Sequence, residues 1–143
     1  MRVLGVDFGL KRVGLAISDE TGTIAQSLQY LDGGSDERVG LALAQVATAR
    51  GASKIVVGVP LRMDGHASQQ TERTLKFITT LGQVTKLPIE RWDERLTTMQ
   101  AERTLLEGNV RRKERKQKID SMAAQIILQS YLDAHNPPQQ SED

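Results

Sequence analysis

The chain has 143 residues, which fits one domain with a single hydrophobic core, and its 26% of charged residues is typical of a globular protein. It has no cysteine, which excludes disulfides, thiolate metal sites and cysteine nucleophiles and agrees with a reducing compartment. No apolar run approaches the roughly 18 residues of a membrane span, so we expect a soluble, cytoplasmic protein that does not enter a membrane.

The chain opens with the pattern of a tight β-hairpin, with strands predicted at residues 3–7 and 13–18. Asp7 lies in the first strand, where an apolar residue would be usual and a carboxylate has to be desolvated. Such a carboxylate is costly unless a cation, a metal or several N–H groups meet it. Gly9 and Gly14 leave room for a phosphate or metal to approach. Asp7 is therefore a candidate metal ligand, and a cap of the hairpin turn is the alternative.

The remaining elements are predicted from periodicity and turn residues. In chain order they are a strand at 24–31, a helix from the cap Ser35 to Gly51, a strand at 54–59, a helix at about 67–84, a strand at 88–92, a helix from Thr97 or Thr98 to about Glu107, and a helix at 119–135. Crossovers of this length favour parallel pairing of the later strands. We predict an α/β fold, a mixed five-stranded sheet flanked by helices, with one domain at 1–136 and a polar tail at 137–143.

Two further carboxylates lie where ligands commonly bind. Glu94 follows the strand at 88–92, at the end where a parallel sheet presents side chains to a ligand cleft; the alternative is a salt bridge with Arg95 or Arg91. Asp120 extends an apolar helix stripe through residues 124, 127 and 131, and the alternative is a helix N-cap.

Three separated carboxylates suit hard divalent cations, since Mg²⁺ or Mn²⁺ prefers oxygen ligands and is commonly held by a few carboxylates plus substrate phosphates. Two such ions can activate a water and stabilise the leaving oxygen of a phosphodiester. His66 and His135 are isolated, in a loop and at a helix end, and are interpreted as surface groups.

A basic segment precedes the last helix. Six cations and one carboxylate give residues 111–118 a net charge of +5, which leaves −4 for the rest of a chain whose total is +1. The segment is interpreted either as a polyanion-binding site or as a solvated, mobile loop. Aromatic residues are only 3% of the chain and are expected mostly in the core, so contacts to the nucleic-acid backbone are favoured over base stacking. The cations are Arg111, Arg112, Lys113, Arg115, Lys116 and Lys118.

Four motifs in order, GVDFGLKRVGLAISD at 5–19, VVGVPLRMDG at 56–65, DERLTT at 93–98 and KIDSMAAQIILQSYL at 118–132, resemble the YqgF family, also called RuvX. The family is described both as a Holliday junction resolvase and as a pre-16S rRNA nuclease. The resemblance implies an RNase H-like fold, a cytoplasmic location and metal-dependent cleavage of phosphodiester bonds at the 5′ end of pre-16S rRNA.

The family's acidic positions fall on Asp7, Glu94 and Asp120. The resemblance implies that Asp7 bridges the Mg²⁺ or Mn²⁺ ions while Glu94 and Asp120 complete their shells. Lys11, Arg12, Arg62 and the basic segment are then expected to neutralise substrate phosphates. Arg62 departs from the family, whose members often have Asn there, and adds a possible phosphate contact.

Alternatives remain at the sequence level. The family resemblance leaves four-way DNA as a second substrate, for which a resolvase that cuts two strands in concert should be a homodimer, whereas an rRNA-processing enzyme can be a monomer. A non-catalytic RNA-binding assembly factor, acting with ribosomal precursor particles, would keep the same fold and acids. An actin-like ATPase or sugar kinase also has an Asp and a Gly in its opening hairpin, but it needs a second domain that 143 residues do not accommodate.

Overall fold

The computed structural model describes residues 1–96 and 112–135, with side chains from Met122 onward in the second stretch. The helix predicted from Thr97 or Thr98 to Glu107, the residue Arg111 and the polar tail at 137–143 lie outside the described residues. Within those residues, no helix is long and apolar enough to cross a membrane.

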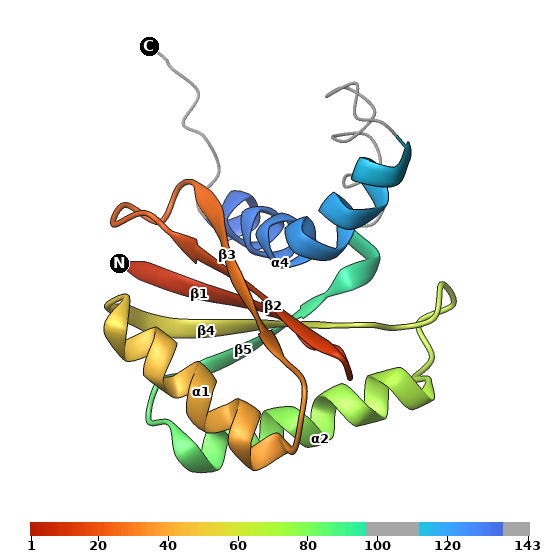
Figure 1. The fold of residues 1–143 in the computed structure, drawn as a ribbon, viewed down its shortest axis with the longest axis horizontal. Helices are drawn as coiled ribbons and strands as arrows, with labels where there is room; N and C mark the ends of the chain where they lie inside the picture. Colours follow the sequence, from red (N-terminus) through yellow and green to blue (C-terminus); the bar gives the residue numbers. More distant parts are fainter. Residues whose placement is uncertain (97–111, 136–143) are drawn as a thin grey trace.

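The five predicted strands form one mixed sheet in the order β3-β2-β1-β4-β5 (Figure 1). The first three strands pair antiparallel, and β4 and β5 run parallel to β1, which confirms the predicted parallel pairing of the later strands. The carboxyl ends of β1, β4 and β5 therefore meet at one edge of the sheet. The strands are β1 (Arg2–Asp7), β2 (Arg12–Ser18), β3 (Ala25–Asp32), β4 (Ala52–Val59) and β5 (Ile89–Asp93).

Helices cover both faces of the sheet. Helices α1 (Asp36–Ala49) and α2 (Gln69–Val84) lie on one face, and α4 (Arg112–His135) lies on the other (Figure 1). The predicted cap Ser35 accepts a hydrogen bond from the backbone N–H of Arg38, and Gly51 follows the helix at a φ of 69°, where glycine is favoured. Helix α2 begins two residues later than predicted because Ser68 and Thr71 form a capping box.

Helix α4 is longer than predicted, and this corrects two alternatives. It begins at Arg112 rather than at residue 119, so residues 112–118 are helical and the interpretation of this stretch as a loop is wrong. Lys, Arg, Glu and Gln are good helix formers, and nothing after Asn109 interrupts them. Asp120 consequently lies about two turns inside the helix, where it cannot be the N-cap.

The sheet separates two cores because successive strand residues point to opposite faces. One core lies under α1 and α2 and includes Leu4, Val6 and Phe77. The other lies under α4 and includes Val3 and Val56, together with α4 residues such as Leu128. Side chains of β1 alternate between the two faces, so its odd-numbered residues lie on the face covered by α4.

The C-terminal half of α4 is fixed to the sheet by a polar and aromatic cluster. The Tyr131 hydroxyl donates to Glu90 Oε1 at 2.8 Å and accepts from Lys54 Nζ at 2.9 Å, while Lys54 and Glu90 form an ion pair at 2.7 Å. His135 stacks on the Tyr131 ring at 4.0 Å, and Trp92 packs edge-on against it at 5.6 Å. This cluster holds the helix that carries Asp120 against β4 and β5.

Replacing Tyr131 by Phe is expected to lower the free energy of unfolding by about 1 kcal/mol, since it removes two hydrogen bonds to charged groups but keeps the buried ring. Urea unfolding monitored by circular dichroism measures the change. Tyr30→Phe is the matched control, because Tyr30 is 42% exposed on the edge strand β3. An equal effect of both substitutions would contradict the role of the Tyr131 hydroxyl.

Candidate active site

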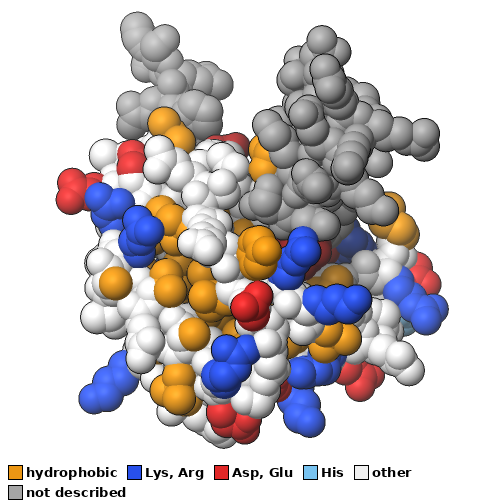
Figure 2. All heavy atoms as spheres, viewed as in Figure 1, with side chains coloured by type: hydrophobic (Ala, Val, Ile, Leu, Met, Phe, Trp, Pro, Cys, Tyr) orange, Lys and Arg blue, Asp and Glu red, His pale blue; other side chains and the backbone are white. Residues whose placement is uncertain are grey.

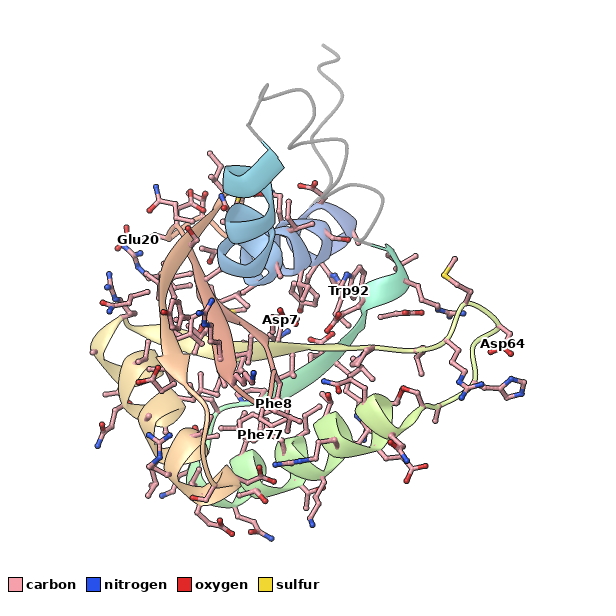
Figure 3. All side chains as sticks on the ribbon, turned by 45° about the vertical axis from the view of Figure 1, so that its right-hand side comes forward. Asp7, Phe8, Glu20, Asp64, Phe77 and Trp92 are labelled. Atoms are coloured by element: carbon pink, nitrogen blue, oxygen red, sulfur yellow. The ribbon has the colours of Figure 1, made fainter. Side chains whose placement is uncertain are left out.

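Asp7 is the last residue of β1 and lies on the α4 face of the sheet. Val3 belongs to the core under α4, whereas Phe8 belongs to the opposite core, so alternation directs Asp7 toward α4. Figure 3 shows Asp7 on the other side of the sheet from the ring pair of Phe8 and Phe77. Those rings stack with centroids 4.3 Å apart and fix the chain directly after Asp7.

Glu94 contacts Asp7 across β4, which separates β1 from β5 in the sheet. It begins the short 3₁₀ turn Glu94–Leu96 that follows β5, and its carboxyl group is hydrogen-bonded to that of Asp7. Burial, the negative charge of Asp7 and this hydrogen bond raise the pKa of Glu94 from 4.5 to about 8. A raised pKa of this size favours the protonated form of Glu94 at neutral pH when no cation lies at the pair.

Arg95 forms a salt bridge with its neighbour Asp93. Its guanidinium binds both carboxylate oxygens of Asp93, with Nη2 at 2.6 Å and Nε at 2.9 Å from Oδ2, and this hydrogen bonding lowers the pKa of Asp93. The alternative for Glu94, a salt bridge with Arg95 or Arg91, stays a prediction, while the neighbours that shift the pKa of Glu94 are Asp7 and Asp93. Arg95 also donates to the carbonyl of Met63 at 3.4 Å, which connects the 3₁₀ turn to the loop after β4.

The course of α4 brings position 120 toward the same edge of the sheet. Tyr131 contacts Lys54 and Glu90, whereas Ile127 lies against Gly58 near the end of β4, so the helix runs toward the carboxyl ends of the strands as its residue numbers fall. Asp120 is seven residues before Ile127, about 10 Å further along the helix axis. Its side chain lies outside the described ones, so the role of Asp120 as a ligand stays a prediction.

Two carboxyl groups therefore meet among the described side chains, and no group of three or more metal-ligating side chains occurs among them. The histidines lie elsewhere: His66 pairs with Asp64 at 3.0 Å, and His135 stacks on Tyr131. A groove of about 460 Å³ between β3 and α1 contains none of the predicted site residues. In Figure 2 hydrophobic side chains gather over this part of the surface. The candidate active site is therefore placed at the paired carboxyl groups of Asp7 and Glu94, because metal ligation requires them, and not in the groove between β3 and α1.

Of the predicted phosphate contacts, Lys11, Arg12 and Arg62 are exposed, while the side chains of the basic segment lie outside the described ones. Arg12 lies over the ring of Tyr30, with its guanidinium carbon 5.1 Å from the ring centroid. The expectation that most aromatic residues lie in the core is confirmed: Phe8, Phe77 and Tyr131 are buried and Trp92 packs partly buried against the core, while Tyr30 is exposed. The sequence offered one signal for Tyr30, its place in a strand that alternates only loosely.

The strand order and the helices on both faces of the sheet are those of an RNase H-like fold. The structure resembles that of T. thermophilus RuvC in complex with Holliday junction substrate, with a TM-score of 0.55, 14% sequence identity and 96% of each chain covered. It also resembles the fowlpox virus Holliday junction resolvase, with a TM-score of 0.54, 15% identity, and 94% of this chain and 99% of that one covered. At these identities the likeness shows the fold alone.

The model of the RuvX family, described as "Holliday junction resolvase", matches residues 1–134, and the chain belongs to this family. A protein of Myxococcus xanthus (strain DK1622) named "Putative pre-16S rRNA nuclease" is 45% identical over 138 residues, 96% of this chain and 91% of that one. A protein of Symbiobacterium thermophilum with the same name is 45% identical over 141 residues, 97% of this chain and 98% of that one.

Proposed function

We propose that this protein is a metal-dependent nuclease of the cytoplasm that processes the 5′ end of pre-16S rRNA. The observation that carries the proposal is the contact of Glu94 with Asp7 at the carboxyl edge of the sheet. Two partly buried acids in contact are unfavourable unless a proton or a cation lies between them. The choice of RNA as the substrate rests on the name of the relatives that are 45% identical over nearly the whole chain.

The residues present fit Mg²⁺ or Mn²⁺. Asp7 and Glu94 provide only carboxylate oxygens, the ligands these cations prefer, and Asp120 is proposed as the third ligand from its position on α4. When bound, the metal supplies an activated water and stabilises charge at the scissile phosphate. Glu94 must lose its proton for the metal to bind, so Glu94 couples metal loading to pH. Asp7 lies at the end of a buried strand whose core packing fixes its direction.

Substrate phosphates are proposed to contact Lys11, Arg12 and Arg62 together with the basic segment. Lys11 and Arg12 lie at the turn that follows Asp7, and Arg62 lies in the loop that Arg95 holds beside the 3₁₀ turn. Cations on both sides of the paired acids would position a phosphodiester across the metal site, while contributing no base recognition.

A second candidate substrate is four-way DNA, which is favoured by the description of the family model. Both functions need the same metal chemistry at Asp7 and Glu94. They differ in assembly, because a resolvase that cuts two strands in concert needs two active sites related by a dimer axis. The substrate itself therefore has to be tested.

The test compares cleavage of labelled RNA that carries a 16S precursor 5′ leader with cleavage of a synthetic four-way DNA junction. Each is incubated with Mg²⁺ or Mn²⁺, and with EDTA, for the natural chain, Asp7→Asn and Asp133→Asn. Asp133 is an exposed carboxylate at the other end of α4 and provides a matched control for the change of charge. We expect metal-dependent cleavage of the RNA, a loss of at least about a hundredfold in Asp7→Asn, and no change in Asp133→Asn.

Cleavage of the junction alone would replace rRNA processing with the resolvase function. If neither substrate is cut while the natural chain and Asp7→Asn bind RNA equally well, the proposal is wrong and the chain is a binding factor. Loss of cleavage in Asp133→Asn as well would show that general charge, and not metal ligation, explains the effect.

A further inference from the structure

We propose that Gly58 is a positioning residue of the metal site. Because Gly58 has no side chain, the Glu94 side chain can lie over β4 and contact Asp7. The role of Gly58 in metal binding rests on the proposed function. The position of the Glu94 side chain over Gly58 rests on the structure alone. It concerns a residue that touches neither substrate nor metal but determines where a ligand lies.

Gly58 lies between the two carboxylates in the sheet. β4 separates β1 from β5, and Gly58 is paired with Trp92 on β5, one residue after the pair formed by Val57 and Val6 of β1. Neighbouring strands are about 4.8 Å apart, so the strands that lead to Asp7 and Glu94 are separated by about 10 Å. Contact between the two side chains therefore requires one of them to lie across β4.

Distances at Gly58 show which side chain crosses. A Cβ atom added to Gly58 would lie 2.9 Å from both Cγ and Oε2 of Glu94, and 2.6 Å from Cδ1 of Ile127. These separations are shorter than carbon atoms tolerate without movement. The Glu94 side chain thus lies directly on the Gly58 backbone, with Ile127 of α4 closing the same space.

Backbone conformation does not explain this glycine. Among the described glycines, positive φ angles occur at Gly22, Gly51 and Gly65, and not at Gly58. Glycine inside a strand weakens the strand, and it commonly marks a site where another group approaches closely. At Gly58 the approaching group is the Glu94 carboxylate.

Gly5 provides a matched control on the same face of the sheet. A Cβ atom there would lie 2.7 Å from Cβ of Leu128 and 3.3 Å from the carbonyl oxygen of Ala124. Gly5→Ala therefore creates a clash with α4 that involves no carboxylate, and it meets fixed atoms of the helix rather than the end of a flexible side chain. Comparing it with Gly58→Ala separates disturbed helix packing from the displacement of Glu94.

The experiment uses Gly58→Ala, Gly5→Ala and, to relieve the contact with α4, Gly58→Ala combined with Ile127→Val, which removes Cδ1. Ile127→Val alone is the reference for the double variant. Metal-free crystal structures measure the contact of the Asp7 and Glu94 carboxyl groups. Calorimetric titration with Mn²⁺ measures metal affinity, and thermal melts measure folding.

We expect both variants that contain Gly58→Ala to lose the carboxyl contact and to bind Mn²⁺ at least about tenfold more weakly than their references. Gly5→Ala should melt earlier yet retain the contact between the Asp7 and Glu94 carboxyl groups. The inference is overturned if a folded Gly58→Ala variant keeps the contact, or if Gly5→Ala loses the same contact. If the natural chain binds no Mn²⁺, the proposed function fails, and the crystal structures still decide whether Gly58 positions Glu94.

Discussion

In metal-free protein, Glu94→Gln is expected to stabilise the fold at alkaline pH while it abolishes metal-dependent cleavage. The carboxyl group of Glu94 contacts Asp7 and is partly buried, so ionising it in the folded state places two like charges together in a poorly solvated site. Glutamine keeps the size of the side chain and its ability to donate a hydrogen bond to Asp7. It carries no charge at any pH.

The sign follows from the pKa of Glu94, which is about 8 in the folded protein against an ordinary value of 4.5. Between these values the folded chain retains a proton that the unfolded chain has released, so the free energy of unfolding falls as pH rises from 4.5 to 8. Each pKa unit corresponds to about 1.4 kcal/mol, which makes the total effect a few kcal/mol. The lowered pKa of Asp93 acts only in acid, outside this window.

Urea unfolding of the natural chain and of Glu94→Gln in EDTA, at pH 5 and pH 9, measures the effect. The difference in free energy of unfolding should be small at pH 5 and should favour Glu94→Gln at pH 9. Added Mn²⁺ should stabilise the natural chain at pH 9 and not the variant, since a ligand stabilises only the state that binds it. Parallel stability curves for the two proteins would show that Glu94 is already ionised at neutral pH.

Local patterns predicted most of the sheet. The alternating runs of β1 and β2, the continuous apolar run of β4 and the cap at Ser35 each reflect interactions within one element, and all are confirmed with shifts of one or two residues. Asp7 was identifiable for the same reason, because a carboxylate in an apolar strand departs from a local rule. A charged residue in an otherwise apolar strand, Asp7, therefore indicated the candidate active site.

Nonlocal features could not be predicted in this way. The partner of Glu94 is Asp7, 87 positions earlier in the chain, and only the pairing of β4 with both neighbours makes their contact possible. Gly58 looks like an ordinary strand glycine until Glu94 is placed on it. The start of α4 was missed for a different reason: a charge run resembles a solvated loop, although its residues are good helix formers.

Phe77→Ala is expected to lower the free energy of unfolding by about 3 to 5 kcal/mol and also to weaken Mn²⁺ binding. Phe77 is fully buried in α2, and its ring stacks on Phe8 at 4.3 Å with an angle of 14° between the planes. Phe8 is covalently next to Asp7, so a cavity at Phe77 frees the end of β1 as well as removing apolar contacts. The loss is large against the 5 to 15 kcal/mol that stabilises a typical domain.

Leu81→Ala separates these two effects. Leu81 is equally buried one turn further along α2, where it packs against α1 near Gly40, so its truncation should cost about 2 to 5 kcal/mol without releasing Phe8. Calorimetry with Mn²⁺ at a temperature where both variants are folded should show weaker binding for Phe77→Ala and natural affinity for Leu81→Ala. Equal affinities would mean that Asp7 is held by the sheet alone. Weaker binding in Phe77→Ala alone would mean that the aromatic pair beneath the sheet helps to hold a metal ligand on its opposite face.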